Sequence, residues 1–346
     1  MLIPHSRPFI DQEDVSAVSD VLSSGNIAQG EKVREFECAI ARFIGTKYAV
    51  ACSSGTSALH LALLSLGLVS QDEIIMPSYV CSSPYLAISH AGAKPRIVDI
   101  DLLDLNICAS NIKKELNIRT KAIIAPHMFG CPAELDRLVD FGIPLIEDCA
   151  QSLGAEYNKR RVGCFGDLST FSFYATKMIT TGEGGMVLTN NEEFYSKIVD
   201  YRDYDKKPLV PARYNYKMTD FQAALGLSQL RKLPYFIERR RHIASVYAER
   251  FSRFPIEIPI VPSHKKSVFY RYVIRSDRMK NIQERAKKKE VMCQPPVFEP
   301  IHKNVANVEC PNSDMAFEKA LSIPLYPSLT DEEIEYLIQT LSIILG

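Results

Sequence analysis

Seven short apolar runs, separated by longer segments, constrain the fold of this chain more than any other feature of the sequence. Several of them are continuously apolar rather than alternating, which is typical of strands covered on both faces. The intervening segments are long enough to form crossover helices. The pattern predicts an α/β fold built on a mostly parallel seven-stranded sheet with helices on both faces. The runs are Tyr48–Cys52, Glu73–Met76, Arg96–Ile100, Ala122–Ala125, Leu145–Glu147, Leu168–Phe173 and Met186–Thr189.

Helical signals flank this region on both sides. Apolar residues recur at helical spacing between Glu31 and Ile44, which predicts an amphipathic helix. Thr219–Gln222 has the spacing of a capping box and opens a helix through about Leu230. Pro234 is expected to stop or restart that helix before a longer one, over about Tyr235–Phe254.

From Pro255 onward the sequence pattern changes, because frequent prolines separate short strand-like and helical segments. Its last helix is expected to begin at the Thr330 cap and to pack Ile334, Leu337, Ile338 and Leu341 inward. We therefore predict a large domain over residues 1–234 and a smaller C-terminal α+β domain over residues 235–346.

Charge and cysteine content exclude several classes of function. Lysine plus arginine and aspartate plus glutamate both total 41, so no global basic field points to nucleic acid or membrane. The basic clusters Arg239–Arg241 and Lys287–Lys289 could contact nucleic acid, but each lies in a helical stretch with flanking acids, which favours solvated helix faces. The nine cysteines show no metal-ligand spacing and are interpreted as reduced thiols, with no metal site. Without a signal-like N-terminus or a long apolar stretch, we expect a cytoplasmic protein.

The strongest candidate for chemistry is Lys177, which follows the apolar run ending near Tyr174 and precedes a glycine-rich bend. Ser172 lies five residues earlier and could place a hydroxyl beside a phosphate. Glycines at 182, 184 and 185 would let the backbone approach a ligand closely. This is how a pyridoxal phosphate lysine is presented, although a lone lysine is more often a surface group.

A second candidate follows the first strand, where Ser53–Leu59 opens an apolar helix. Its free amides and hydroxyls, with Gly55 and Thr56 among them, would face an anion under the helix dipole. The segment therefore indicates a phosphate site, while an ordinary N-cap remains an equal alternative.

A third candidate ends another strand, where Asp148 and Gln151 reach the carboxyl edge of the sheet. An anionic Asp148 would keep a pyridine nitrogen protonated, and Gln151 could hydrogen-bond the 3-oxygen of the ring. Structural caps are the alternative reading of these two side chains.

Taken together, the chain resembles the DegT/DnrJ/EryC1/StrS sugar aminotransferases, which are fold-type I pyridoxal phosphate enzymes. The resemblance spans nearly the whole chain. The motifs that carry it are Ser23-Ser24-Gly25 to Gly30, Ser54-Gly55-Thr56, Glu147-Asp148-Cys149-Ala150-Gln151, Ser172 to Lys177, Thr181-Gly182-Glu183-Gly184-Gly185, Tyr214-Asn215-Tyr216-Lys217-Met218 and Leu321-Ser322-Ile323-Pro324-Leu325.

The resemblance implies a role for each matching residue. Lys177 would form the internal aldimine and later move the proton, while Asp148 and Gln151 would contact the cofactor ring. Gly55, Thr56 and Ser172 would hold the phosphate. An asparagine of the neighbouring subunit also reaches this phosphate in the family, and Asn215 is the matching candidate, with Lys217 as a second possibility. A homodimer with its active site at the subunit interface follows.

Some positions depart from the family pattern. Cys81 stands where an aromatic residue commonly stacks on the cofactor ring, so it is a candidate ring contact. Asn26 and Phe298 replace residues that are usually aromatic and tyrosine, respectively. Glu183 and His302 are candidates for contact with substrate, although a lone histidine is more often structural.

The resemblance implies a ping-pong transfer of an amino group from an amino acid, expected to be L-glutamate, to a keto sugar, expected to be nucleotide-linked, in amino-sugar biosynthesis. Sugar dehydratases of the family carry histidine where this chain has Lys177, which favours transamination. The alternatives are a keto-cyclitol aminotransferase, a pyridoxal-phosphate-dependent sugar dehydratase and, least favoured, a non-enzymatic regulator with the same fold.

Overall fold

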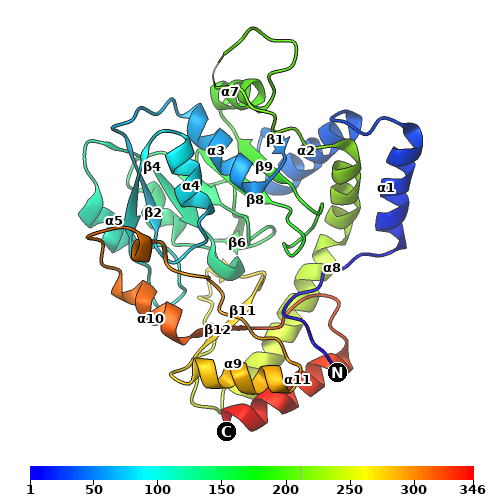
Figure 1. Cartoon of the computed structure of the whole chain (residues 1–346), viewed down its shortest axis with the longest axis vertical. Helices are drawn as coiled ribbons and strands as arrows, with labels where there is room; N and C mark the ends of the chain where they lie inside the picture. The colour runs from blue at the N-terminus through cyan, green and yellow to red at the C-terminus, as the bar shows by residue number, and fades with distance from the viewer. Residues whose placement is uncertain (211) are drawn as a thin grey trace.

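One central sheet of seven strands organises the computed structural model, which describes residues 1–210 and 212–346 (Figure 1). The strand order is β1-β9-β8-β5-β4-β2-β3, and only β9 runs antiparallel to its neighbours. The seven apolar runs of the sequence therefore become its seven strands, as predicted. These strands are β1 (Tyr48–Cys52), β2 (Glu73–Pro77), β3 (Lys94–Val98), β4 (Thr120–Pro126), β5 (Leu145–Asp148), β8 (Leu168–Ser172) and β9 (Gly185–Thr189).

Helices cover both faces of the sheet, which explains why the strands are apolar throughout. Val50 of β1 joins a buried cluster with Leu61, whereas the next residue, Ala51, joins a cluster on the opposite face with Phe36. Side chains of successive strand residues point to opposite faces, so both faces need apolar side chains. One face packs against α3 (Gly55–Ser65), α4 (Ser83–His90) and α7 (Glu192–Arg202), and the other against α2 (Glu31–Ile44), α5 (Ala109–Glu115), α6 (Leu135–Val139) and α8 (Asp220–Phe251).

Helix α8 is one continuous helix of 32 residues, so the predicted stop or restart at Pro234 is wrong. A proline inside a helix costs about 3 kcal/mol, because one hydrogen bond is lost and the ring clashes with the preceding turn. Leu233 and Phe236 on either side are buried, and burial of such side chains contributes about 1.5–3 kcal/mol each. Tertiary packing therefore outweighs the local penalty. The capping box of Thr219 and Gln222 is present, as predicted.

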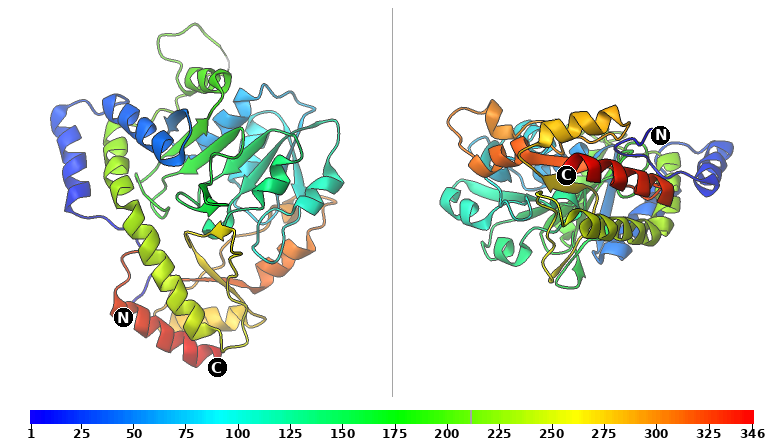
Figure 2. Two further views of the ribbon diagram at one scale, coloured as in Figure 1. Left: turned by 180° about the vertical axis from the view of Figure 1, so that it is seen from behind. Right: turned by 90° about the horizontal axis from the view of Figure 1, so that it is seen from below.

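The C-terminal elements form a third buried cluster at the lower end of α8 (Figures 1 and 2). Strands β11 and β12 pair antiparallel there, and α11 begins at the predicted Thr330 cap with all four predicted residues buried. The predicted boundary at residue 234 falls within α8, and the division into two domains stays a prediction. The elements are β11 (Tyr272–Arg275), α9 (Met279–Lys288), α10 (Pro311–Lys319), β12 (Ala320–Ile323) and α11 (Asp331–Leu345).

The remaining elements include the N-terminal helix α1 and several short segments. The N-terminal segment reaches the C-terminal cluster through Ile3 before α1 begins, so the first residues lie beside α11 in Figure 1. No helix in the described part of the chain is both long enough and apolar enough to cross a bilayer. The short elements are α1 (Gln12–Ser24), η1 (Met128–Gly130), β6 (Glu156–Tyr157), β7 (Arg160–Arg161), β10 (Lys265–Lys266) and η2 (Ile301–Asn304).

The two basic clusters have different environments. Lys287–Lys289 is exposed, as predicted. The interpretation of Arg239–Arg241 as a solvated face is wrong, because Arg240 is only 4% exposed and donates to the carbonyl oxygens of Tyr270 and Leu325. Through these hydrogen bonds, Arg240 of α8 stabilises the position of the C-terminal segments.

Candidate active site

Four parallel strands end at one edge of the sheet, and the candidate residues follow their ends. Gly55 comes after β1, Cys81 after β2, Asp148 ends β5, and Ser172 ends β8. Parallel strands present their carboxyl ends together, where open α/β sheets bind ligands. Lys177 follows β8 and acts electrostatically on both Asp148 and Cys81. The structure therefore brings these predicted residues to one place.

The phosphate site predicted at the start of α3 is a tightly packed loop. A Cβ added to Gly55 would lie 2.8 Å from the Cβ of Ser172, and one added to Gly185 would lie 2.1 Å from the carbonyl oxygen of Ser54. Only glycine fits at these two positions. The hydroxyl of Ser54 accepts a hydrogen bond from the Ser57 amide at 3.1 Å, and Thr56 shares one with Ser83 at 2.7 Å. The amides at the start of a helix lack partners within the helix, so those not taken by the Ser54 hydroxyl could donate to an anion.

Asp148 lies buried at the end of β5, with one carboxylate oxygen accepting the Ala150 amide at 3.0 Å. Burial raises the pKa of this carboxyl group, and the nearby positive charge of Lys177 opposes that rise. A cationic ring nitrogen beside Asp148 would stabilise its ionised form. The oxygen of the Gln151 side chain accepts the Phe129 amide at 2.8 Å, which orients its NH₂ group as a donor.

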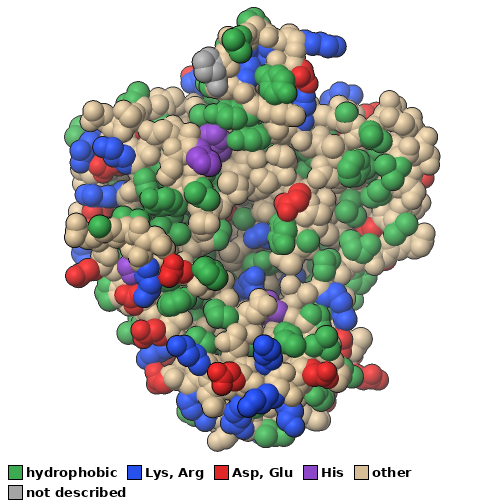
Figure 3. Space-filling model, viewed as in Figure 1, with side chains coloured by type: hydrophobic (Ala, Val, Ile, Leu, Met, Phe, Trp, Pro, Cys, Tyr) green, Lys and Arg blue, Asp and Glu red, His purple; other side chains and the backbone are tan. Residues whose placement is uncertain are grey.

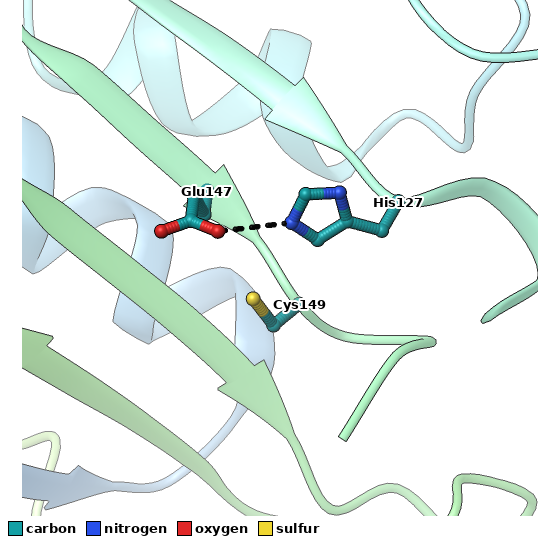
Figure 4. A group of neighbouring side chains, drawn as sticks. All are labelled: His127, Glu147 and Cys149. Carbon is teal, nitrogen blue, oxygen red and sulfur yellow. Dashed lines mark hydrogen bonds and ion pairs between the residues drawn. The ribbon is translucent and has the colours of Figure 1, made fainter. Parts of the chain in front are cut away.

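The two sequence neighbours of Asp148, Glu147 and Cys149, form a buried trio with His127 at the end of β5 (Figure 4). Nδ1 of His127 accepts the Ala133 amide at 3.0 Å, so its Nε2 carries the proton and donates to Glu147 at 3.2 Å. The carboxylate of Glu147 also accepts three backbone amides, those of Gly163, Phe165 and Gly166. These four donors occupy the acceptor sites of the Glu147 carboxylate. Burial raises the pKa of the Cys149 thiol well above its usual value, so the thiol stays protonated. The trio therefore has the character of a structural support rather than of a metal site.

Replacing Glu147 by glutamine is expected to destabilise the protein by about 3–5 kcal/mol, because an NH₂ group would then face backbone donors in a buried site. Urea unfolding measures this loss. Glu193→Gln, which removes a carboxylate from an exposed pair with Lys197, is the control and should leave stability nearly unchanged, because solvent screens the pair. Equal effects of the two substitutions would contradict a supporting role for Glu147.

Lys177 lies between β8 and β9, with its backbone amide donating to the Tyr174 carbonyl at 2.9 Å. Its Nζ lies 5.0 Å from the ring centroid of Tyr270, which is buried. Burial alone would raise the pKa of Tyr270, but the charges of Lys177 and Arg271 outweigh it and lower that pKa to about 8. The hydroxyl of Tyr270 also contacts Thr176 at 3.3 Å. Sequence reasoning missed Tyr270, because only the tertiary fold brings it to the lysine.

The remaining candidates lie in different settings. Desolvation, followed by the charge of Asp148, raises the pKa of the Cys81 thiol, so its sulfur lies near Asp148 although part of the residue is exposed. Asn215 and Glu183 are exposed, and the Glu183 carbonyl accepts the Gln222 amide at 2.9 Å. Lys217 pairs with Asp203 at 3.0 Å and also with Asp205.

His302 is buried and bonded on both sides of its ring. Its Nδ1 lies 2.6 Å from the Ser78 hydroxyl, and its Nε2 lies 3.4 Å from Asp314. Since both ring nitrogens already have partners, this setting favours the structural alternative for His302 over contact with substrate.

A family model for the DegT/DnrJ/EryC1/StrS aminotransferases matches residues 8–342. The chain belongs to this family. It is 33% identical to GDP-perosamine synthase from Escherichia coli over 98% of each chain. Its structure is similar to that of PseC from Helicobacter pylori, an aminotransferase involved in pseudoaminic acid biosynthesis, with a TM-score of 0.93, 28% identity, and coverage of 100% of this chain and 99% of that one.

Another similar structure is the PLP form of the putative sugar aminotransferase Spr1654 from Streptococcus pneumoniae, with a TM-score of 0.94, 27% identity, and coverage of 99% of this chain and 98% of that one. The PMP form of Spr1654 is similar as well. The protein is thus an aminotransferase that uses pyridoxal phosphate. Its own residues suit this cofactor, because the loop that only glycine can form at 55 and 185 would offer backbone amides to a phosphate, and the buried carboxyl group of Asp148, near Lys177, could face a cationic ring nitrogen.

Proposed function

We propose that this aminotransferase moves an amino group from L-glutamate to a nucleotide-linked keto sugar in amino-sugar biosynthesis. The convergence of Lys177, Asp148 and the Gly55–Ser172 contact at one sheet edge carries the proposal. The relatives support the sugar, since one is named a GDP-perosamine synthase and another a spore coat polysaccharide biosynthesis protein. A cytoplasmic location remains a prediction.

Each residue of the site has a defined task in this proposal. When bound, pyridoxal phosphate supplies a ring that withdraws electrons from the carbon bearing the amine. Asp148 would hold a proton on the ring nitrogen, and Gln151 would donate its NH₂ group to the ring oxygen. The amine of Lys177 takes the proton from the amino-acid α-carbon and delivers one to the sugar carbon. The amides of the α3 N-terminus and the Ser172 hydroxyl bind the phosphate.

The assay that tests this function follows both halves of the reaction. Purified protein is incubated with L-glutamate and a panel of nucleotide-linked keto sugars, and 2-oxoglutarate and amino sugar are measured. Equimolar formation of the two products is expected. Activity on keto-inositols alone would favour the cyclitol alternative, and loss of water from the sugar without a stable amine product would favour the dehydratase. A protein that binds the cofactor but turns over none of these would support the regulator.

We further propose that the active site lies at the interface of a homodimer, with Asn215 reaching the phosphate of the partner subunit. Asn215 is exposed, while its neighbours Tyr214 and Tyr216 are anchored through their amides to the carbonyls of Tyr201 and Arg202. The segment is therefore held firmly with one side chain presented outward. Lys217 is the weaker candidate, because two carboxylates of its own chain already pair with it.

Hybrid dimers test the shared site. Lys177→Ala and Asn215→Ala homodimers should both have low activity, but mixing and re-associating them should restore about one quarter of the wild-type activity, because half of the dimers then hold one intact site. The quantity measured is specific activity before and after mixing. If Asn215 acts within its own subunit, every site in the mixture stays defective and no activity returns.

A further inference from the structure

An ion pair covers the backbone of β1 at the edge of the central sheet. β1 stands at one end of the strand order, and an edge strand has peptide groups that no neighbouring strand can bind. Glu37 and Arg202 come from α2 and α7, which flank β1 in Figure 1, and their charged groups lie 2.6 Å apart. Glu37 accepts the Ala51 amide at 2.8 Å, and Arg202 donates to the Ala51 carbonyl at 2.9 Å. At Ala51 the pair therefore takes the place of a neighbouring strand.

The pair is largely withdrawn from solvent. The side chains of Glu37 and Arg202 are 17% and 9% exposed, and the buried Nε of Arg202 has no hydrogen-bond partner among the described residues. Removing two charges from water costs free energy, so a buried ion pair stabilises a fold less well than apolar side chains of similar size. Its hydrogen bonds are directional, however, and they fix the position of Ala51.

Two segments of the active site are joined to this pair. Ser53 lies two residues after Ala51 and begins the loop Ser53–Gly55, here called the phosphate loop. The Ser53 amide donates to the Tyr216 carbonyl at 2.8 Å, and the Tyr216 amide donates to the Arg202 carbonyl at 3.0 Å. The backbone of Tyr216 is therefore bonded both to the phosphate loop and to a member of the ion pair.

Asn215 precedes Tyr216 and has an exposed side chain. On the other side of Tyr216, Lys217 pairs with Asp203 at 3.0 Å. Residues 203–210 project from the molecule in Figures 1 and 3. Asn215 thus lies at the surface near the base of this projection, where a second subunit has access to it.

We propose that Glu37 and Arg202 are positioning residues that link the two active sites of the dimer. In each subunit the pair holds the phosphate loop of its own site and, through Tyr216, the Asn215 side chain that enters the other site. The inference rests on the shared site proposed above. Because one pair fixes both segments, its loss in one subunit weakens cofactor binding in both sites.

Cofactor affinity tests this role without any turnover. The holoenzyme is dialysed against a range of pyridoxal phosphate concentrations, and occupancy of Lys177 is measured by visible absorbance. Glu37→Gln and Arg202→Gln should each weaken the affinity about 10-fold, within the usual range for coupling between two sites. Arg202→Lys should recover most of the affinity, because a single nitrogen of Arg202 donates to both Glu37 and Ala51. Glu35→Gln, which breaks an exposed pair on the same helix, is the control and should bind like the wild type.

Hybrid dimers with one working site show which sites the pair serves. In a hybrid of Lys177→Ala and Glu37→Gln subunits, the remaining lysine faces an altered phosphate loop and receives Asn215 from an unaltered segment. In a hybrid of wild type and the double variant Lys177→Ala/Glu37→Gln, the working site keeps its own loop and receives Asn215 from the altered subunit. Each should bind the cofactor at Lys177 about threefold more weakly than a hybrid of wild type and Lys177→Ala, since the two effects together give the tenfold loss.

Unchanged affinity in either hybrid would overturn the proposal. The second hybrid is decisive, because its working site contains no altered residue of its own subunit. Thermal unfolding verifies that the variants are folded, and Glu37→Asp, which keeps the charge on a shorter side chain, replaces Glu37→Gln if that variant does not fold. Restored activity in the mixture of Lys177→Ala and Asn215→Ala, with no change in the second hybrid, would reject the link alone, whereas no restoration would reject the shared site itself.

Discussion

Lys177→Ala is expected to lower the rate of amino transfer by about 10²–10⁴-fold or more, because the substitution removes both the covalent attachment of the cofactor and the group that moves the proton. Two measurements check this result. The first is the rate of 2-oxoglutarate formation from L-glutamate. The second is mass spectrometry after borohydride reduction, which should find the cofactor attached to the wild-type peptide containing Lys177 and to no peptide of the variant.

The control for this experiment is Lys113→Ala, which removes an exposed lysine of α5. It should keep full activity and the labelled peptide. Attachment of the cofactor to another lysine in the Lys177→Ala variant, with activity retained, would remove the basis of the proposed mechanism.

Asp148→Asn is expected to lower the turnover rate by about 10²–10³-fold, or about 2.7–4 kcal/mol in the barrier, which is the range for one buried electrostatic contact at a reacting group. Asparagine keeps an oxygen that can accept the Ala150 amide, so the strand end should stay folded. What is lost is the negative charge that holds a proton on the ring nitrogen. Rapid-mixing spectroscopy of the reaction with L-glutamate measures the change.

Asp140→Asn at the exposed end of α6 is the matched control and should react at the wild-type rate. Thermal unfolding separates the two possible causes of a slow Asp148 variant. A large drop in melting temperature would attribute the loss to misfolding, whereas an unchanged melting temperature with slow chemistry agrees with an electrostatic role.

The sheet could be predicted from the sequence because its signal is local. Val50 and Ala51 are both apolar although they face opposite sides, and such continuous apolar runs arise when helices cover both faces. The location of the candidate site could also be predicted from the sequence, because Asp148 and Ser172 are the last residues of parallel strands and share one edge of the sheet. Their convergence follows from topology alone.

Other features could not be predicted, because they depend on contacts between distant segments. Proline ordinarily interrupts a helix, but burial of the residues around Pro234 keeps α8 continuous. Arg240 belongs to a basic cluster that cannot be told in sequence from a solvated face, and its hydrogen bonds to the distant carbonyls of Tyr270 and Leu325 form only in the folded chain. Tyr270 lies beside Lys177 because the segment before β11 is hydrogen-bonded to the distant backbone of Phe129 and Gly130.

The single antiparallel strand of the sheet closes the loop that carries Lys177. Because β9 reverses direction, the segment carrying the lysine leaves the sheet at Ser172 and returns at its direct partner Gly185. Just beyond that pair, the Phe173 amide donates to the Gly184 carbonyl at 2.9 Å, which holds the two ends of the loop together. Lys177 therefore lies in a loop whose two ends are paired with each other, rather than in a crossover connection between parallel strands. An insertion elsewhere at this edge would lengthen a loop, whereas one inside this closed loop would shift the amine relative to Asp148.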